Sequence, residues 1–127
     1  MPPLLEALRI MDIQYATLEG GVRLVKLSGR LDIIGTGEIE TRFTGCCAGD
    51  KVHVIVDLAG VDFLASIGIR MLVLTAKSVA YRGGRMVLLN PTEDVYHILD
   101  LAGILSIIPV YGSMESAQAV VGGVPPA

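Results

Sequence analysis

One hydroxyl group near the middle of the chain stands out. The stretch VDFLASIGIRML, residues 61–72, places Ser66 between an apolar run typical of the end of a strand and a run with helical spacing. Such a serine can cap the helix, worth ~1 kcal/mol, by accepting a hydrogen bond from the backbone N–H of Gly68 or Ile69. It can also carry a phosphate, because a helix N-terminus favours anions. A phosphate on Ser66 would add about −1.5 to −2 charges beside apolar neighbours such as Phe63. A partner docked on this apolar surface would then be expelled.

The other groups able to do chemistry are not arranged as a catalytic or cofactor site. Gly35-Thr36-Gly37 begins a dinucleotide-binding fingerprint, but Glu40 occupies the position of its third glycine and would repel a pyrophosphate. No serine has the Gly-x-Ser-x-Gly setting of a nucleophile elbow. His53 and His97 stand in unrelated segments, where structural or solvated roles are expected. The sequence therefore predicts a protein that is not an enzyme and that needs no cofactor and no metal.

The composition narrows the classes of partner and the compartment. A net charge of −3 and scattered basic residues give no stripe for a phosphate backbone, so nucleic acid is not an expected partner. No apolar run reaches the ~18 residues of a membrane span, and the first residues do not resemble a signal peptide. The adjacent Cys46 and Cys47 suit ordinary reduced thiols rather than a disulfide or a zinc site. We expect a cytoplasmic protein without direct membrane insertion.

Hydrophobic patterning predicts a single α/β domain that positions Ser66 between a strand and a helix. Strands are expected at 12–18 and 22–27, joined as a β-hairpin by Gly20-Gly21, and then at 52–58, 85–89 and 105–110. Helices are expected at 32–48, at 66–81, from Thr92 to a stop at Gly103, and at 113–121. Because strands and helices alternate after the hairpin, the later strands should run parallel. Residues 1–11 form an N-terminal extension in this interpretation, and residues 122–127 a disordered tail.

Three blocks of sequence resemble one known family. They are VRLVKLSGRLD at residues 22–32, VHVIVDLAGVDFLASIGIRML at 52–72, and GGRMVLLNPTEDVYHILDLAGI at 83–104. Together they are similar to a STAS domain of the bacterial anti-sigma factor antagonist type, over about residues 12–121. The resemblance implies a mixed sheet of four or five strands with helices packed on one side. It also implies a non-enzymatic role, in which the protein binds an anti-sigma factor and so frees a sigma factor.

The resemblance gives Ser66 a specific role. The family motif, close to Phe-Leu-Asp-Ser-Ser/Thr-Gly-Leu-Gly, aligns with residues 63–70, so Ser66 takes the position of the phosphorylated serine and Gly68 that of the motif glycine. The acidic residue before the serine is Ala65 here. In regulated members a protein-serine kinase, which is itself the anti-sigma factor, adds the phosphate, and a PP2C-type phosphatase removes it.

Arg70 is a second departure, because it replaces the last glycine of the motif, as Ile67 replaces the second hydroxyl. Four residues after Ser66 on a helix, Arg70 faces the same side and can pair with a phosphate, or it is an ordinary solvated residue. The residues expected to contact the partner are Asp32, Asp62, Phe63, Ser66, Gly68 and Arg70.

Three functions remain open from the sequence. The first is an anti-sigma factor antagonist switched by phosphorylation of Ser66. The second is a STAS-domain subunit of a lipid or anion transport system, or of a signalling scaffold, without a phosphoswitch. The third is a small-molecule or nucleotide-binding domain. The sequence does not predict the oligomeric state.

Overall fold

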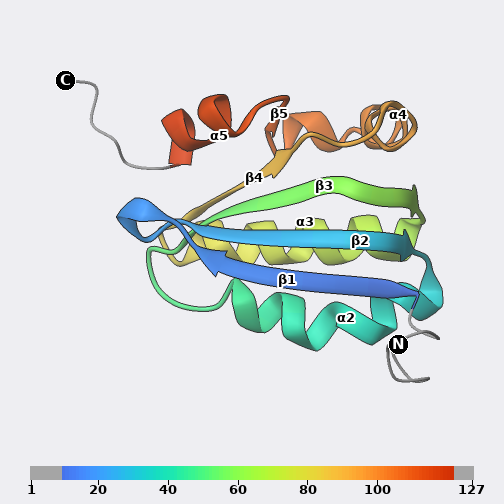
Figure 1. Ribbon diagram of the computed structural model, residues 1–127, viewed down its shortest axis with the longest axis horizontal. Coiled ribbons are helices and arrows are strands. Elements are labelled where there is room, and N and C mark those ends of the chain that lie inside the picture. The colour runs from blue at the N-terminus through green and yellow to red at the C-terminus, as the bar shows by residue number, and fades with distance from the viewer. Residues whose placement is uncertain (1–9, 122–127) are drawn as a thin grey trace, which may run out of the picture.

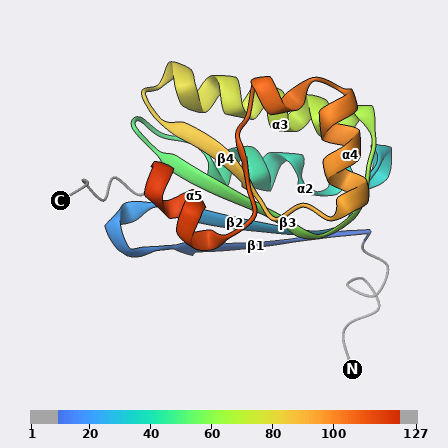
Figure 2. The same ribbon diagram turned by 90° about the horizontal axis from the view of Figure 1, so that it is seen from above.

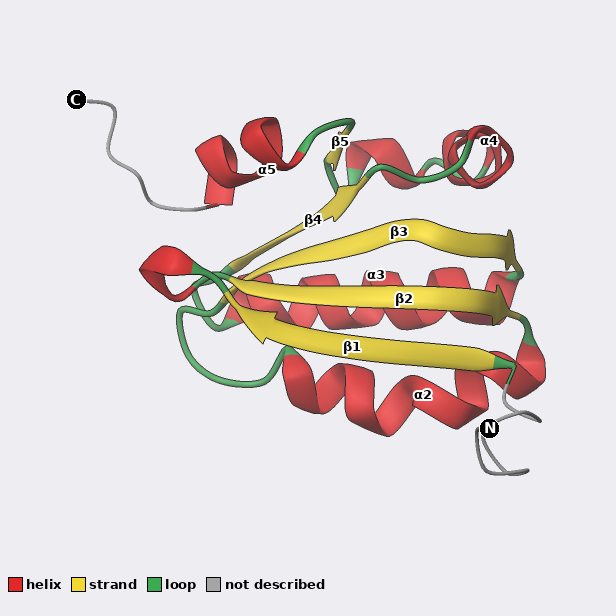
Figure 3. Ribbon diagram, in the orientation of Figure 1, coloured by secondary structure: helices red, strands yellow, loops and turns green. Residues whose placement is uncertain are grey.

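The computed structural model describes residues 10–121, which form a five-stranded sheet with helices on both faces (Figure 1). The strands lie in the order β1 (Met11–Thr17), β2 (Arg23–Leu31), β3 (His53–Leu64), β4 (Arg85–Leu89) and β5 (Val110–Tyr111). β1 pairs with β2 antiparallel, and the other neighbours pair in parallel (Figure 3). The predicted hairpin and the predicted parallel strands are confirmed.

The helices are α2 (Ile33–Cys46), α3 (Ser66–Tyr81), α4 (Glu93–Leu101) and α5 (Met114–Val121), with short 3₁₀ turns η1 (Glu19–Gly21) and η2 (Ile104–Ser106). The larger core lies between the sheet and α2, α3 and α4, where Phe43, Leu72 and Leu99 are fully buried. α5 packs Ala117 on the opposite face of the sheet, over Ile55 of β3. Figure 2 shows α5 apart from the layer that α2 and α3 form. The expectation that helices pack on one side therefore holds for α2, α3 and α4 but not for α5.

The central strand β3 is apolar because both of its faces are covered. Val54 and Val56 point into the larger core, and Ile55 between them points into the smaller one. All three side chains are fully buried. A parallel strand covered on both sides reads as a continuous apolar run rather than an alternating one, which is why its position was predictable.

β2 and β3 run further than expected, to Leu31 and Leu64 rather than to residues 27 and 58. The pairing between them shifts register after Lys26 and again after Gly29, so the strands continue through irregular pairing instead of ending at glycines. Gly29 itself has a φ of 110°, in the region that favours glycine. This extra length carries the strand ends to the start of α3.

The predicted strand at 105–110 is wrong over most of its length. The backbone N–H groups of Ile107 and Ile108 both donate to the carbonyl of Ile104, at 2.8 and 2.8 Å, which closes the turn at η2. Pro109 has no N–H to give to a sheet, although its carbonyl accepts from the N–H of Leu88 at 2.9 Å. Only the two residues of β5 therefore extend the sheet.

The two predicted terminal segments fall largely outside the described residues. The expected tail, residues 122–127, lies outside the described residues, and so do residues 1–9 of the expected extension. Met11, the last residue assigned to that extension, already belongs to β1 and is buried. Within residues 10–121, no helix is both long enough and apolar enough to cross a membrane.

Candidate functional site

The carboxyl end of β2 brings the starts of two helices together. α2 follows β2 directly, and α3 begins after the neighbouring strand β3 (Figure 1). The backbone N–H of Ala65 donates to the carbonyl of Leu31 at 2.9 Å, which ties the start of α3 to the end of β2. Gly68, fully inside the first turn of α3, packs so closely on Leu31 that an added Cβ would lie 2.9 Å from the Leu31 Cβ. Gly68 is buried, and its lack of a side chain allows α3 to approach β2 this closely.

The start of α2 is capped by a charged side chain. Asp32 has extended backbone, and its Oδ1 accepts a hydrogen bond from the backbone N–H of Gly35 at 2.8 Å. This hydrogen bond holds the pKa of the Asp32 carboxyl below its usual value, with a smaller lowering from Arg30 and an opposing contribution from partial burial. Asp32 therefore stays ionised at neutral pH, at the positive end of a helix dipole.

Arg30 links Asp32 to Phe63. Its Nε lies 3.4 Å from Asp32 Oδ2, the only ion pair among residues 10–121, and its guanidinium lies 4.4 Å from the centre of the Phe63 ring. Arg30 and Phe63 are register partners on β2 and β3, so the pairing of the strands places them side by side. Sequence analysis missed Arg30, because the pairing between the strands was not visible in the sequence.

The start of α3 has no such cap among residues 10–121, so the alternative in which the Ser66 hydroxyl caps this helix does not hold. Ala65 occupies the N-cap position, with φ −92° and ψ 168°, and its carbonyl accepts from the N–H of Ile69 at 3.1 Å. Ser66 is therefore already the first helical residue, and no side chain caps this end. The Ser66 side chain is exposed, and its hydroxyl makes no hydrogen bond to any residue in the range 10–121.

Exposed apolar side chains border this end of the molecule. Ile67 follows Ser66 and is 38% exposed, and Phe63 is 36% exposed. In the first turn of α2, Ile33 and Ile34 are 74% and 63% exposed. Only one side of this turn packs on the sheet, because Gly35 and Thr36 are buried whereas the two isoleucines are not. An apolar surface of this kind is typical of a site where a partner docks.

The structure brings some of the predicted contact residues together. Asp32, Phe63 and Ser66 all lie where β2 and β3 meet the starts of α2 and α3. Asp62 is exposed beside Phe63 on β3, and Arg70 is exposed one turn after Ser66 on α3. We use the name Ser66 surface for the exposed residues of this region together with the half-buried Asp32: Arg30, Asp32, Ile33, Ile34, Asp62, Phe63, Ser66, Ile67 and Arg70.

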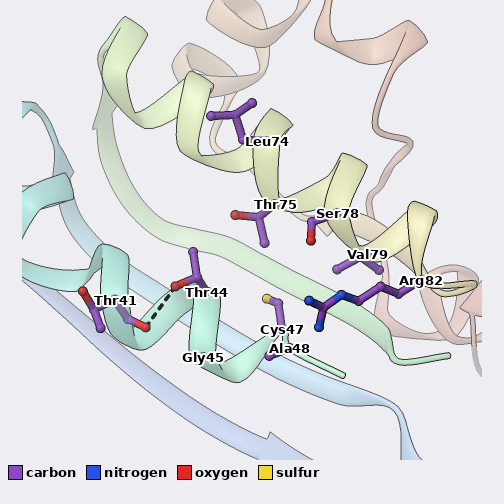
Figure 4. A pocket seen from close by; sticks show the side chains of 10 residues that line it. All are labelled: Thr41, Thr44, Gly45, Cys47, Ala48, Leu74, Thr75, Ser78, Val79 and Arg82. Carbon is purple, nitrogen blue, oxygen red and sulfur yellow. Dashed lines mark hydrogen bonds between the residues drawn. The ribbon is translucent and has the colours of Figure 1, made fainter. Parts of the chain in front are cut away.

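A groove of about 430 Å³ lies between the later turns of α2 and α3, away from the Ser66 surface (Figure 4). Thr44 lines it from α2, Thr75 and Ser78 line it from α3, and Arg82 reaches across from the end of α3. Burial raises the pKa of the Cys47 thiol in its wall to about 12, so this thiol stays protonated. No predicted contact residue lines the groove. Within the described part of the chain, no three His, Cys, Asp or Glu residues are grouped as metal ligands.

The structure defines a domain of the α/β class, with a five-stranded mixed sheet between helices. The model of the STAS domain family matches residues 15–117, most of the chain. The chain therefore belongs to the STAS domain family. Its similar curated proteins are regulators rather than enzymes, which agrees with the prediction of a non-enzymatic protein.

Two curated relatives cover most of the chain. A protein of Bordetella bronchiseptica, BtrV, described as a candidate anti-sigma factor antagonist, is 28% identical over 99 residues, which cover 78% of this chain and 85% of that protein. The anti-sigma F factor antagonist of Paenibacillus polymyxa is 26% identical over 98 residues, covering 76% of this chain and 84% of that protein.

Solved structures share the fold. An anti-sigma factor antagonist from Mycobacterium paratuberculosis superposes with a TM-score of 0.78 at 22% identity, covering 87% of this chain and 93% of that one. The unphosphorylated form of the antagonist SpoIIAA gives a TM-score of 0.70 at 19% identity over 86% of this chain and 96% of that one. The murine anion transporter Slc26a9 also gives 0.70 at 17% identity, over 88% of this chain but only 22% of the transporter. These likenesses establish the STAS fold.

Proposed function

We propose that this chain is an anti-sigma factor antagonist that docks on a kinase-type anti-sigma factor through the Ser66 surface. The observation that carries the proposal is the exposed Ser66 hydroxyl, free of hydrogen bonds within residues 10–121 and bordered by the apolar side chains of Phe63 and Ile67. Two relatives that cover most of the chain support it, because both are named as anti-sigma factor antagonists. In this role the protein is a ligand and a kinase substrate, and it catalyses nothing.

Ser66 is the regulated residue in this proposal. The kinase transfers the γ-phosphoryl group of ATP to the Ser66 oxygen, the hydroxyl proton leaves, and ADP is released. A PP2C-type phosphatase hydrolyses the phosphoserine and restores the hydroxyl. The added charge, about −1.5 to −2 at neutral pH, sits at a contact that must lose its water when the partner docks, so it weakens the complex.

The open start of α3 makes a phosphate at Ser66 compatible with the fold. Among residues 10–121, no side chain accepts a hydrogen bond from the first N–H groups of this helix, and Ser66 lies beside them. Helix N-termini favour negative charge, and an exposed phosphate there causes no burial of charge in the free protein. The phosphate is therefore tolerated in the free chain and costly in the complex, which is the requirement for a switch.

The second candidate function is a STAS subunit of a transport system or signalling scaffold. Its support is the likeness to the anion transporter Slc26a9, of which this chain spans about a fifth, 22%. This alternative uses the same fold without a phosphoswitch. A transporter protein that copurifies with the chain, together with an unmodified Ser66, would favour it.

The test is a binding titration with the anti-sigma factor that copurifies with this chain from its own cells. Ser66→Ala should keep the affinity within about threefold, because the hydroxyl has no partner to lose. Ser66→Asp should weaken binding about tenfold or more, which corresponds to ~1.4 kcal/mol. Ser78→Asp is the matched control, because Ser78 is an exposed serine on the same helix but outside the Ser66 surface. Equal affinities for Ser66→Asp and Ser78→Asp would refute the phosphoswitch.

A further inference from the structure

Arg30 lies beside the start of α3 although it belongs to β2. It pairs in register with Phe63, and the next pair along the strands is Leu31 with Leu64. Ala65 then bonds to the carbonyl of Leu31, and Ser66 follows as the first residue of the helix. The guanidinium is thus held over the ring of Phe63, which precedes the phosphorylatable Ser66 by three positions in the chain. A long, flexible arginine side chain can span such a separation.

The present contacts of Arg30 leave most of its hydrogen-bonding capacity unused. The ion pair with Asp32 is a single contact of 3.4 Å from Nε, long for a charge-assisted hydrogen bond. Neither Nη atom donates to any group in residues 10–121, and the side chain is 53% exposed. The four Nη–H donors form the planar fork that binds carboxylates and phosphates by two bonds at once.

We propose that, when Ser66 carries a phosphate, Arg30 exchanges its contact with Asp32 for the phosphate oxygens. The inference rests on the proposed phosphorylation of Ser66. A phosphate offers three acceptor oxygens and up to two negative charges, whereas Asp32 offers one charge, and its Oδ1 already accepts from Gly35. Asp32 keeps that hydrogen bond after the exchange, so α2 remains capped.

The exchange changes the shape of the Ser66 surface as well as its charge. The guanidinium moves from above the Phe63 ring toward the start of α3, and the ring loses the cation that now covers it. Asp32 loses its ion-pair partner and becomes a free carboxylate. A partner that docks on Arg30, Asp32 and Phe63 in the unmodified protein therefore meets a different arrangement of all three.

Arg70 is the competing cation. It is exposed, it lies one helical turn after Ser66, and it forms no ion pair within the described residues. A phosphate bound by Arg70 would leave the Arg30 contacts intact. The nearby acidic groups, Asp32 and Asp62, lie on the ends of β2 and β3 and raise the pKa of any phosphate there. A test must therefore separate the two arginines while leaving these carboxylates in place.

The test uses the full chain with phosphoserine incorporated during translation at position 66, followed through its second ionisation by ³¹P NMR. The reference is a phosphorylated peptide of residues 61–72. We expect the phosphate pKa, ordinarily ~6, to fall by about 0.5 to 1 unit in the protein. Arg30→Gln should remove most of this fall, Arg30→Lys should keep part of it, and Arg70→Gln should leave it nearly unchanged. Loss of the shift in Arg70→Gln but not in Arg30→Gln would overturn the proposal.

A second measurement needs no variant, so it stands even if Arg30→Gln destabilises the fold. The ¹H–¹⁵N signal of the Arg30 Nε group should shift on phosphorylation of Ser66, and the Arg70 signal should move less. An unmoved Arg30 signal would overturn the exchange. Both experiments use phosphoserine placed by translation, so they need neither the kinase nor the anti-sigma factor. A chain that binds no anti-sigma factor would refute the proposed function, but it would leave the Arg30 result unaffected.

Discussion

The starts of α2 and α3 lie against the same end of β2, yet they differ in their N-terminal capping. In each helix the third residue is a glycine, Gly35 or Gly68, pressed on the backbone of β2. The residue three positions earlier is Asp32 in α2 and Ala65 in α3. Asp32 bonds to the N–H of its glycine, whereas Ala65 has no side chain that can do so.

The start of α2 is therefore capped by a side chain, whereas the start of α3 leaves its N–H groups and the Ser66 hydroxyl free, within the described residues, to bind another group. At α2 the side chain of Asp32 accepts from the N–H of Gly35, and Arg30 balances the charge of Asp32. At α3 the first turn has no side-chain cap, and the serine beside it is exposed. An uncapped helix start costs stability. Because the start of α2 is capped and the start of α3 is not, we infer that the free N–H groups and the hydroxyl at α3 serve binding rather than stability.

The first prediction concerns the close approach to β2 that both helix starts share. Gly35→Ala would place a Cβ against the carbonyl oxygen of Arg30, a backbone atom that cannot rotate away. We expect a loss of about 3 kcal/mol in the free energy of unfolding, measured by urea denaturation. Gly37→Ala is the matched control, because nothing lies within 4 Å of its added Cβ. That variant should gain about 0.5 kcal/mol or more, and equal losses in both would show that the close approach is not real.

The second prediction compares hydroxyls at two helix starts. Thr92 caps α4 by accepting from the N–H of Val95 at 3.2 Å, so Thr92→Ala should lose about 1 kcal/mol of stability. Ser66→Ala removes no hydrogen bond and should change stability by less than about 0.5 kcal/mol. Thermal unfolding of the two variants beside the parent chain measures both. A loss in Ser66→Ala as large as that in Thr92→Ala would restore the capping role.

The third prediction concerns a variant that adds an N-cap side chain to α3, like the one that α2 already has. Ala65 already has the extended backbone of an N-cap, so Ala65→Asp places a carboxylate beside the N–H of Ile67 or Gly68. The free energy of unfolding should rise by about 0.5 to 1 kcal/mol, partly through the helix dipole. Ala65→Leu, which cannot accept a hydrogen bond, serves as the control. No gain over that control would mean that the first turn of α3 is already satisfied.

The smallest effect is in the pH dependence. The pKa of Asp32 in the folded chain is lowered from its ordinary value of 3.8. The stabilisation that ionised Asp32 gives to the fold is therefore complete at pH values above about 3.8. The stabilisation should decline as the pH falls below about 3.8 through the lower folded pKa, as the unfolded chain takes up the proton first. Asp32→Asn should flatten this part of the stability profile, measured by urea denaturation between pH 2 and pH 6. An unchanged slope would contradict the lowered pKa.

The features predictable from the sequence were local ones. Helix limits followed from signals such as Thr92 at the start of α4 and Gly83, with a φ of 83°, at the end of α3. The strand ends were not predictable, because Gly29 lies inside β2, and the register shifts that carry the chain past it depend on β3. The helices on both faces escaped prediction for a similar reason, since α5 packs on residues from three different strands.

The site was predictable in its centre but not in its surroundings. Ser66 and Phe63 follow from a motif that is continuous in sequence. Arg30 enters only through strand pairing, and Ile33 is exposed because the first turn of α2 faces β2 with Gly35 instead. Whether Ser66 caps α3 could not be decided from the sequence, because the hydrogen bond from the Ala65 N–H to the Leu31 carbonyl belongs to the tertiary structure and precedes an N-cap at Ala65.

The most direct test of the account compares the affinity of the anti-sigma factor for the unmodified chain and for the chain with phosphoserine at position 66. If Ser66 lies at the contact, the unmodified chain should bind tightly and the phosphate should lower the affinity at least about tenfold, worth ~1.4 kcal/mol. Equal affinities would contradict the claim that Ser66 lies at the contact. Failure of both forms to bind would contradict the assignment of the Ser66 surface as the docking site.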